Sequence, residues 1–188
     1  VNEVPIDNDY DIRVFDSPKE LQSAIMEKND DQSLGISRLT ATYDWEYSSQ
    51  SKPKDSDYWC VRIGDWSCPW NRQLAKEKES KHLSWIEQSQ TIHEIGSTFT
   101  VQGFDLNYVG VIIGPSVKYR DGKIIFDISE SKNKSAVQNR KLESGEMINY
   151  GETLLRNELN VLLTRGVNGL YVYAVDEELQ QALKNATK

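Results

Sequence analysis

The sequence predicts an α/β fold in which helices flank a parallel β-sheet. The apolar run from Tyr108 to Ile113, followed by glycine and proline, is typical of a strand buried on both faces of such a sheet. A second apolar run, Leu170 to Val175, closely follows a segment with leucines at helical spacing, Leu154 to Leu163. Strands that alternate with helices in this way build parallel sheets.

The N-terminal elements follow the same alternation. Residues Tyr10 to Phe15 are predicted to form a short strand. Ser17 then caps a helix from Pro18 to about Lys28, with proline at the first helical position and Glu20 completing a capping box. Because Leu34 to Tyr43 is predicted as a second strand, the three elements form a βαβ unit.

Residues 44–94 are predicted to be an insertion within a single domain, 1–188. The insertion contains all five tryptophans, and Tyr58 to Trp66 is predicted to form a β-hairpin with a Gly-Asp turn. Exposed aromatic rings can stack on nucleic-acid bases or contact a protein partner, whereas buried rings form a satellite core, which is the commoner outcome. The run Lys76 to Lys81 is predicted to be a solvated helix.

The C-terminal half continues with a second hairpin, Val117 to Asp127, around an Asp-Gly turn. The lysine-rich segment Ser129 to Ser144 is predicted to be a flexible loop or a loose helix. Gly166 is expected to end the preceding helix in the left-handed conformation. The last element is a helix over residues 177–186.

Length and charge limit the function. A chain of 188 residues with 38% hydrophobic residues is long enough for one well-packed domain. The net charge of −7 argues against a stand-alone nucleic-acid-binding module, because phosphate contacts require lysine and arginine. It does not exclude one half of a larger motor, in which only a narrow groove need be basic.

The cysteines and histidines do not predict a metal site. Cys60 and Cys68, with His82 and His93, lack the spacing of a zinc site, so no metal ligand is expected. Free thiols suit a reducing compartment, and no apolar run reaches membrane length. We therefore expect a cytoplasmic protein that does not contact the membrane.

Arg165 is the first candidate functional residue. It stands at the end of a predicted helix and immediately before an inner strand, the position from which many P-loop ATPases offer an arginine finger to a phosphate. The alternative is that Arg165 only offsets the helix dipole. Arg156 lies nine residues earlier and faces the opposite side of the helix, so it is expected to anchor the helix or meet an acid.

A second candidate segment runs from Thr98 to Asp105. Hydroxyls and glycine amides in such a turn can bind phosphate, and a carboxylate just beyond them can accept a ribose hydroxyl. The alternative is a plain loop that caps the next element.

Together these segments resemble motifs V and VI of the second motor domain of superfamily 1 helicases. Motif V there is threonine-rich and ends in Gln-Gly-(Leu/Phe)-(Glu/Asp), and motif VI ends in Thr-Arg-(Ala/Gly) before a strand; residues 98–105 and 160–166 stand in those places. The chain is also similar, from Ile36 to Leu183, to an uncharacterised family of bacterial P-loop ATPases grouped with Schlafen-type helicase domains. The run Tyr108 to Pro115 and the Tyr-Val-Tyr strand at 171–173 carry that similarity.

The resemblance implies a RecA-like sheet that lacks a P-loop of its own. The chain has no Gly-x-x-x-x-Gly-Lys-(Ser/Thr) motif and no Asp-Glu pair at a strand end. Because the first residue is Val1, we expect the C-terminal half of a longer polypeptide. Its N-terminal P-loop domain would bind most of the ATP and Mg²⁺, and single-stranded DNA or RNA would be the other partner.

The resemblance also implies roles for individual residues. Arg165 would be the arginine finger, and Arg38, at the motif IV position, would assist it or lie in a surface salt bridge. The expected nucleotide contacts are Gln102, Gly103 and Asp105, and the expected nucleic-acid contacts are Thr98 and Thr100. Two positions depart from the pattern, because Asp105 replaces a common glutamate and Phe99 a common histidine. The alternatives are a protein-interaction module of an ATPase switch and an inactive motor domain.

Overall fold

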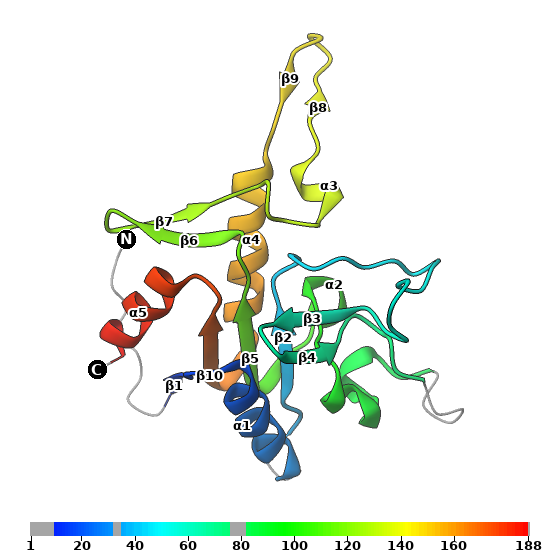
Figure 1. Ribbon diagram of the computed structural model, residues 1–188, viewed down its shortest axis with the longest axis vertical. Helices are drawn as coiled ribbons and strands as arrows, with labels where there is room; N and C mark the ends of the chain where they lie inside the picture. The colour runs from blue at the N-terminus through cyan, green and yellow to red at the C-terminus, as the bar shows by residue number, and fades with distance from the viewer. Residues whose placement is uncertain (1–9, 32–34, 76–81, 188) are drawn as a thin grey trace.

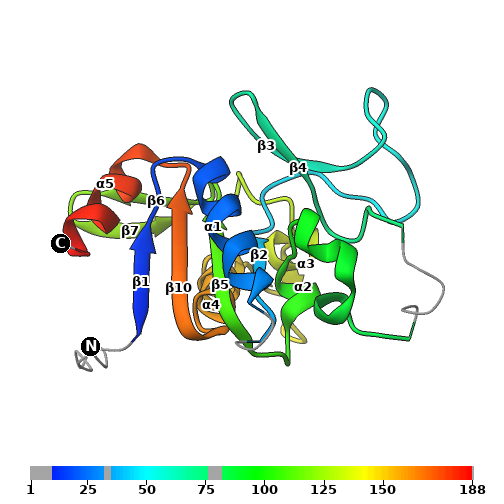
Figure 2. The ribbon, with the colours of Figure 1, turned by 90° about the horizontal axis from the view of Figure 1, so that it is seen from below.

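The computed structural model describes residues 10–31, 35–75 and 82–187. At its centre is a four-stranded, all-parallel sheet flanked by helices, which confirms the predicted α/β class and is consistent with a RecA-like fold (Figures 1 and 2). The strand order is β1-β10-β5-β2. The bounds are Asp11–Val14 for β1, Arg38–Ala41 for β2, Leu106–Ile113 for β5 and Gly166–Ala174 for β10.

Strand β5 is buried along almost its whole length, as its apolar run predicts. Its side chains alternate between the two faces, and each face has its own hydrophobic cluster. Val109, Val111 and Ile113 belong to one cluster, and Ile112 belongs to the other. Gly110 leaves room for α1, since a Cβ there would come within 2.7 Å of Ile25.

Helices cover both faces of the sheet (Figure 2). Helix α1 (Pro18–Asp30) packs on one face through Leu21 and Ile25, and α4 (Gly151–Leu163) packs on the other through Leu159 and Leu162. Helix α5 (Glu177–Ala186) adds Leu179 to the α4 side. The predicted α1 cap is confirmed, because Ser17 Oγ accepts a 3.2 Å hydrogen bond from the Glu20 main-chain nitrogen.

Residues 44–94, which we continue to call the insertion after the prediction, contain the predicted hairpin. Strands β3 (Cys60–Ile63) and β4 (Trp66–Pro69) pair around Gly64 and Asp65, and two 3₁₀ helices follow, η2 (Trp85–Glu87) and η3 (Ser89–His93). All five tryptophans pack into the two hydrophobic clusters of the domain, with Trp70 and Trp85 buried. The core interpretation is therefore confirmed, although the rings join the main clusters instead of forming a separate one. The predicted helix at 76–81 lies outside the described residues.

A buried carboxylate fastens the insertion. Glu94 accepts hydrogen bonds from the main-chain nitrogens of Gln73 and Leu74, at 2.9 and 3.0 Å, and from the Trp85 indole. Burial is the main cause that raises the pKa of this carboxyl above its usual range. The segment after β4 and the helix η2 are thus held to one side chain.

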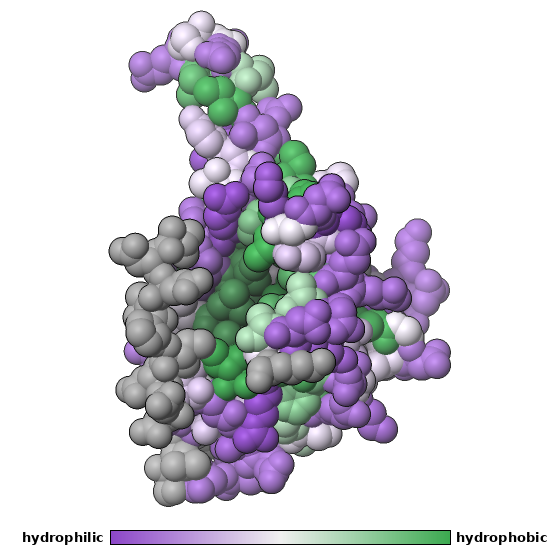
Figure 3. All heavy atoms as spheres, turned by 90° about the vertical axis from the view of Figure 1, so that its left-hand side faces the viewer, coloured by the Kyte–Doolittle hydropathy of each residue, from purple (hydrophilic) through white to green (hydrophobic). Residues whose placement is uncertain are grey.

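The second hairpin is confirmed, but the segment after it differs from the prediction. Strands β6 (Val117–Arg120) and β7 (Lys123–Phe126) pair as expected. Instead of a loop or loose helix, residues 129–148 form a short helix, α3 (Lys134–Val137), and a narrow hairpin of β8 (Arg140–Lys141) and β9 (Met147–Ile148). This hairpin, which we call the arm, projects from the body of the domain (Figures 1 and 3).

The prediction for Gly166 was wrong. Helix α4 ends at Leu163, and the Thr164 hydroxyl donates a 2.8 Å hydrogen bond to the Asn160 carbonyl. Gly166 has no positive φ and begins β10. Glycine is required there by a close approach, since a Cβ would lie 2.1 Å from the Gly169 carbonyl oxygen.

Candidate functional site

The two charged candidates lie side by side at the amino-terminal edge of the sheet. Asp105 immediately precedes β5, and Arg165 immediately precedes β10, its parallel neighbour. The Leu106 main-chain nitrogen donates a 2.8 Å hydrogen bond to the Arg165 carbonyl, which fixes the two positions relative to each other. Strand pairing therefore brings together residues that are sixty positions apart in sequence.

The Arg165 guanidinium reaches the surface beside Asp105. Its Nη1 lies 3.9 Å from Asp105 Oδ1, and the exposed fractions of the two side chains are 22% and 75%. Its Nε donates to the Val161 carbonyl at 3.0 Å, and Nη1 donates to the Phe104 carbonyl at 3.4 Å. Because an exposed ion pair of this length contributes little free energy, the guanidinium can exchange its partners at small cost.

The other expected nucleotide contacts share this edge. Gln102 and Gly103 are exposed in the turn between α2 (Thr98–Val101) and β5. Gly103 has a φ of +86°, and a Cβ there would have no neighbour within 4 Å, so glycine is needed for the backbone conformation and not for space. The residues Gln102, Gly103 and Asp105 are thus exposed beside the partly buried Arg165, and the four form one group at this edge.

Arg38 lies elsewhere and is buried, with 3% of its surface exposed. It donates to Thr91 Oγ1 at 2.8 Å, Asn29 Oδ1 at 2.6 Å, and the carbonyls of Ser37 and Gln88 at 2.8 and 3.2 Å. Burial among these neutral acceptors lowers its pKa to about 10. The geometry favours a structural role that ties β2 to α1 and η3. A contact between Arg38 and a nucleotide stays a prediction.

The two threonines expected to bind nucleic acid differ in their surroundings. The Thr100 hydroxyl is buried and engaged with Ser97, donating to its carbonyl and accepting from its nitrogen, each at 2.8 Å. The Thr98 hydroxyl is buried without a hydrogen-bond partner in the described part of the chain, and Thr98 lines a pocket. Of the two, only Thr98 is free for a new contact.

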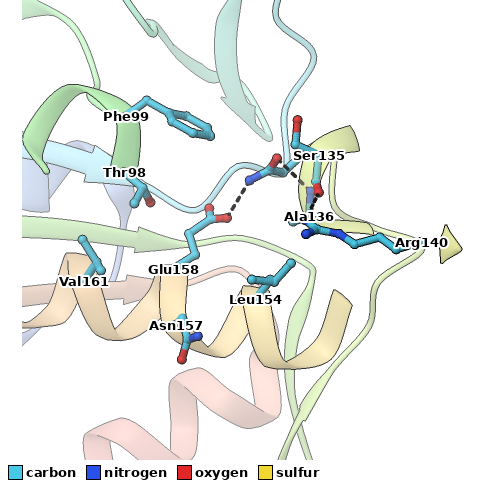
Figure 4. Close-up of a pocket in the computed structure, with 10 residues that line it drawn as sticks. Thr98, Phe99, Ser135, Ala136, Arg140, Leu154, Asn157, Glu158 and Val161 are labelled. Carbon is cyan, nitrogen blue, oxygen red and sulfur yellow. Dashed lines mark hydrogen bonds between the residues drawn. The ribbon is translucent and has the colours of Figure 1, made fainter. Parts of the chain in front are cut away.

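This pocket is a hollow of about 290 Å³ between α2, α3 and α4 (Figure 4). We call it the α4 pocket. Phe99 and Glu158 face it from opposite sides, and Arg140, at the base of the arm, lies at its rim (Figure 4). The lining residues are Thr98, Phe99, Asn133, Ser135, Ala136, Arg140, Leu154, Asn157, Glu158 and Val161.

Glu158 is the residue that the sequence reasoning missed. It is buried in the middle of α4, where its carboxylate accepts a 2.6 Å hydrogen bond from the Tyr43 nitrogen and a 3.2 Å bond from Asn133 Nδ2. Burial raises the pKa of Glu158 to about 7, and the nearby charge of Asp44 contributes. One signal was present, because Glu158 falls at helical spacing on the apolar stripe that includes Leu155.

The remaining expectations concern charges, metals and membranes. Arg156 pairs with Glu152 at 3.2 Å and lies 5.4 Å from the centre of the Phe126 ring, so it meets an acid, as predicted. Within residues 10–31, 35–75 and 82–187 there is no cluster of metal-ligating side chains. No helix in the same residues has the length and apolar character needed to cross a bilayer.

Comparisons with known proteins identify the family of the chain. Residues 1–176 match the family model described as Schlafen group 3, DNA/RNA helicase domain. The chain is 36% identical over 181 residues, 95% of its length, to the uncharacterised protein YPL245W of Saccharomyces cerevisiae, and it spans 37% of the length of that protein. No solved structure matches the chain. The family match supports a helicase-like role on nucleic acid, and the chain belongs to the Schlafen group 3 DNA/RNA helicase domain family.

Proposed function

We propose that this domain is the second motor half of an ATP-dependent nucleic-acid helicase or translocase and that Arg165 is its arginine finger. The observation that carries the proposal is the group at the amino-terminal edge of the sheet, where Nη1 of the partly exposed Arg165 lies 3.9 Å from Oδ1 of Asp105, beside the Gly103 turn. The guanidinium is held by two main-chain carbonyls, a long 3.5 Å hydrogen bond to Thr164 Oγ1 and one weak ion pair, and it can exchange these contacts for a phosphate.

The position of this group suits a shared site. Open α/β sheets bind their own ligands at the carboxyl ends of the strands, whereas Arg165 and Asp105 precede theirs. An amino-terminal edge is therefore better placed to complete a pocket on another domain. A P-loop domain elsewhere in the polypeptide would hold the triphosphate and Mg²⁺, which offsets phosphate charge. Asp105 would accept a ribose hydroxyl, and Gln102 and Gly103 would line the closed interface.

The proposed role of Arg165 is electrostatic. Charge develops on the phosphate oxygens during phosphoryl transfer, and a donor already held nearby stabilises that charge. Measured arginine fingers contribute about a thousandfold or more to the rate. Release from the Val161 carbonyl would free the Nε donor of Arg165 for this contact.

The test is ATP hydrolysis by the full-length protein with and without single-stranded DNA or RNA. Arg165→Ala is expected to lower kcat by about a thousandfold or more while binding to the strand is retained. Arg156→Ala is the matched control, since it removes an arginine of α4 that contacts Glu152 and Phe126 and not Asp105. Full activity in Arg165→Ala would overturn the finger.

Two alternatives give different results in the same assay. An ATPase switch without helicase activity would hydrolyse ATP at a rate that nucleic acid does not change. An inactive motor domain would give no hydrolysis in the wild-type protein. Either result would reject the proposed motor, even if the nucleotide is bound.

A further inference from the structure

We propose that the α4 pocket receives one unstacked nucleobase of the bound single strand, which stacks on Phe99 and donates hydrogen bonds to Glu158. The inference deepens the proposed function, because it assumes that the domain holds a nucleic-acid strand. It assigns a base-reading contact to residues for which neither the family match nor the motifs give a role.

The first support is the aromatic ring. Phe99 is 59% exposed, although it is fixed from one side by an edge-on contact with Tyr43, with ring centres 5.6 Å apart. An exposed ring held in place offers a stacking surface without the entropic cost of ordering it. Aromatic rings of this kind are the usual platforms for bases of single-stranded nucleic acids.

The second support is the carboxyl group opposite the ring (Figure 4). Each Glu158 oxygen accepts one hydrogen bond from the described residues, from Tyr43 or from Asn133. A carboxylate oxygen has two lone pairs, so each oxygen retains one acceptor position. The Watson–Crick edge of guanine carries two adjacent N–H donors, and it is therefore the edge that best matches two carboxylate oxygens.

The third support is the polar rim. The Thr98 hydroxyl lacks a hydrogen-bond partner in the described ranges and lies in the pocket wall. Arg140 is exposed at the rim, where its Nη2 donates only a long 3.3 Å bond to the Ser135 carbonyl. A guanidinium at the mouth of the pocket suits the backbone phosphate of a nucleic-acid strand whose base points inward.

The location and size of the pocket agree with this occupant. Glu158 is anchored by Tyr43, two residues after the carboxyl end of β2, which is the edge where open α/β sheets bind ligands. The hollow of about 290 Å³ is slightly smaller than the range of about 300–1,000 Å³ for small-ligand pockets. It therefore suits a single base and not a whole nucleotide.

The test measures binding of the full-length protein, without ATP, to labelled oligonucleotides by fluorescence anisotropy at fixed salt. The DNA probes are a thymine 12-mer and the same 12-mer with one central guanine. The RNA probes are the corresponding pair of uracil 12-mers. Wild type is expected to bind the guanine-containing oligonucleotide about fivefold more tightly than the one without guanine. If only the DNA pair or only the RNA pair shows this preference, that pair identifies the nucleic acid that the protein binds. If the oligonucleotides with and without guanine bind equally well, both as DNA and as RNA, the proposal is overturned.

Variants separate the two contacts. Phe99→Ala is expected to weaken binding of all strands about tenfold, and Phe99→Trp to restore it, because stacking needs only an aromatic face. Glu158→Gln is expected to remove the guanine preference. Tyr58→Ala and Glu152→Gln are matched controls, an exposed aromatic in the insertion and an exposed acid on α4, and should bind as wild type. Unchanged binding in Phe99→Ala, or a retained preference in Glu158→Gln, would reject the pocket.

The outcome can be separated from that of the motor proposal. Arg165→Ala should abolish ATP hydrolysis and keep the guanine preference. If Phe99→Ala binds normally while Arg165→Ala is inactive, the pocket is rejected and the motor remains supported. If the guanine preference is present while Arg165→Ala hydrolyses ATP normally, the pocket is supported and the finger is rejected.

Discussion

The Arg165 guanidinium is hydrogen-bonded to the main chain of Val161, a residue that lines the α4 pocket. Arg165 Nε donates to the Val161 carbonyl at 3.0 Å, one turn back along the helix. The last turn of a helix has carbonyls without helical partners, and this arginine satisfies one of them. A turn of Arg165 toward a phosphate would break this bond, so the end of α4 would change together with the nucleotide site.

Asp105 is predicted to affect nucleotide affinity and not the rate of hydrolysis. In the full-length protein, Asp105→Ala should raise KM for ATP about three- to tenfold, the loss of one hydrogen bond, with kcat nearly unchanged. The wild type should discriminate against ATP analogues that lack a ribose hydroxyl, and the variant should not. Asp65→Ala, which removes an exposed acid from the β3–β4 turn, is the control. A lower kcat with unchanged KM would contradict the ribose role.

Arg38 is predicted to stabilise the fold. Arg38→Met would remove the buried guanidinium that donates to Thr91 Oγ1, to Asn29 Oδ1 and to the Ser37 carbonyl. We expect the free energy of unfolding to fall by roughly 3 kcal/mol, measured by urea denaturation. Arg62→Met, at an exposed position on β3, should change it little. Unchanged stability combined with lost ATP hydrolysis would instead restore the phosphate role expected from the motif order.

Glu158 is predicted to make the stability depend on pH. Its pKa of about 7 in the folded protein exceeds its ordinary value of 4.5. Since the folded state holds the proton more tightly, its contribution is fully present below pH 4.5 and is lost as pH rises through 7. The full loss is roughly 3 kcal/mol. The Glu158→Gln variant lacks this loss, so its stability relative to wild type should increase across that window; a constant difference would contradict the raised pKa.

Glu94 is predicted to hold the insertion together. Glu94→Ala would leave the main-chain donors of Gln73 and Leu74 and the Trp85 indole without their acceptor. We expect a loss of roughly 3 kcal/mol in unfolding free energy, and faster hydrogen exchange at residues 71–75. Glu46→Ala, which removes an exposed acid, is the control and should leave both measurements unchanged.

Local patterns in the sequence were sufficient for the sheet and its main helices. The apolar run of β5, the cap at Ser17 and the two glycine turns extend over a few residues, so each could be recognised without the rest of the chain. The arm could not be recognised, because its strands are two residues long and carry no repeating apolar pattern. The Gly166 prediction failed because a helix stop and a close backbone approach both select glycine.

The candidate site was predictable only in part, because some of its contacts join residues that are far apart in sequence. Arg165 and Asp105 come together through the pairing of two strands that the sequence did identify. Glu158 and Arg38 have partners that are far away in sequence, such as Tyr43 for the former and Thr91 for the latter. The order of motifs along the sequence placed Arg38 at the motif IV position. It could not predict that buried neutral acceptors surround the side chain.

Helix α4 is one uninterrupted rod from Gly151 to Leu163, with the Phe99–Glu158 hollow along its flank and Arg165 just past its tip. A helix of this kind moves as a rigid body, because its internal hydrogen bonds make bending costly and rotation of the whole helix easier. Leu159 and Leu162 pack against the sheet and fix the point about which the helix would rotate. Because the Arg165 carbonyl accepts a hydrogen bond from the Leu106 nitrogen, a base bound against the flank that moved the end of the helix would also move the start of β5.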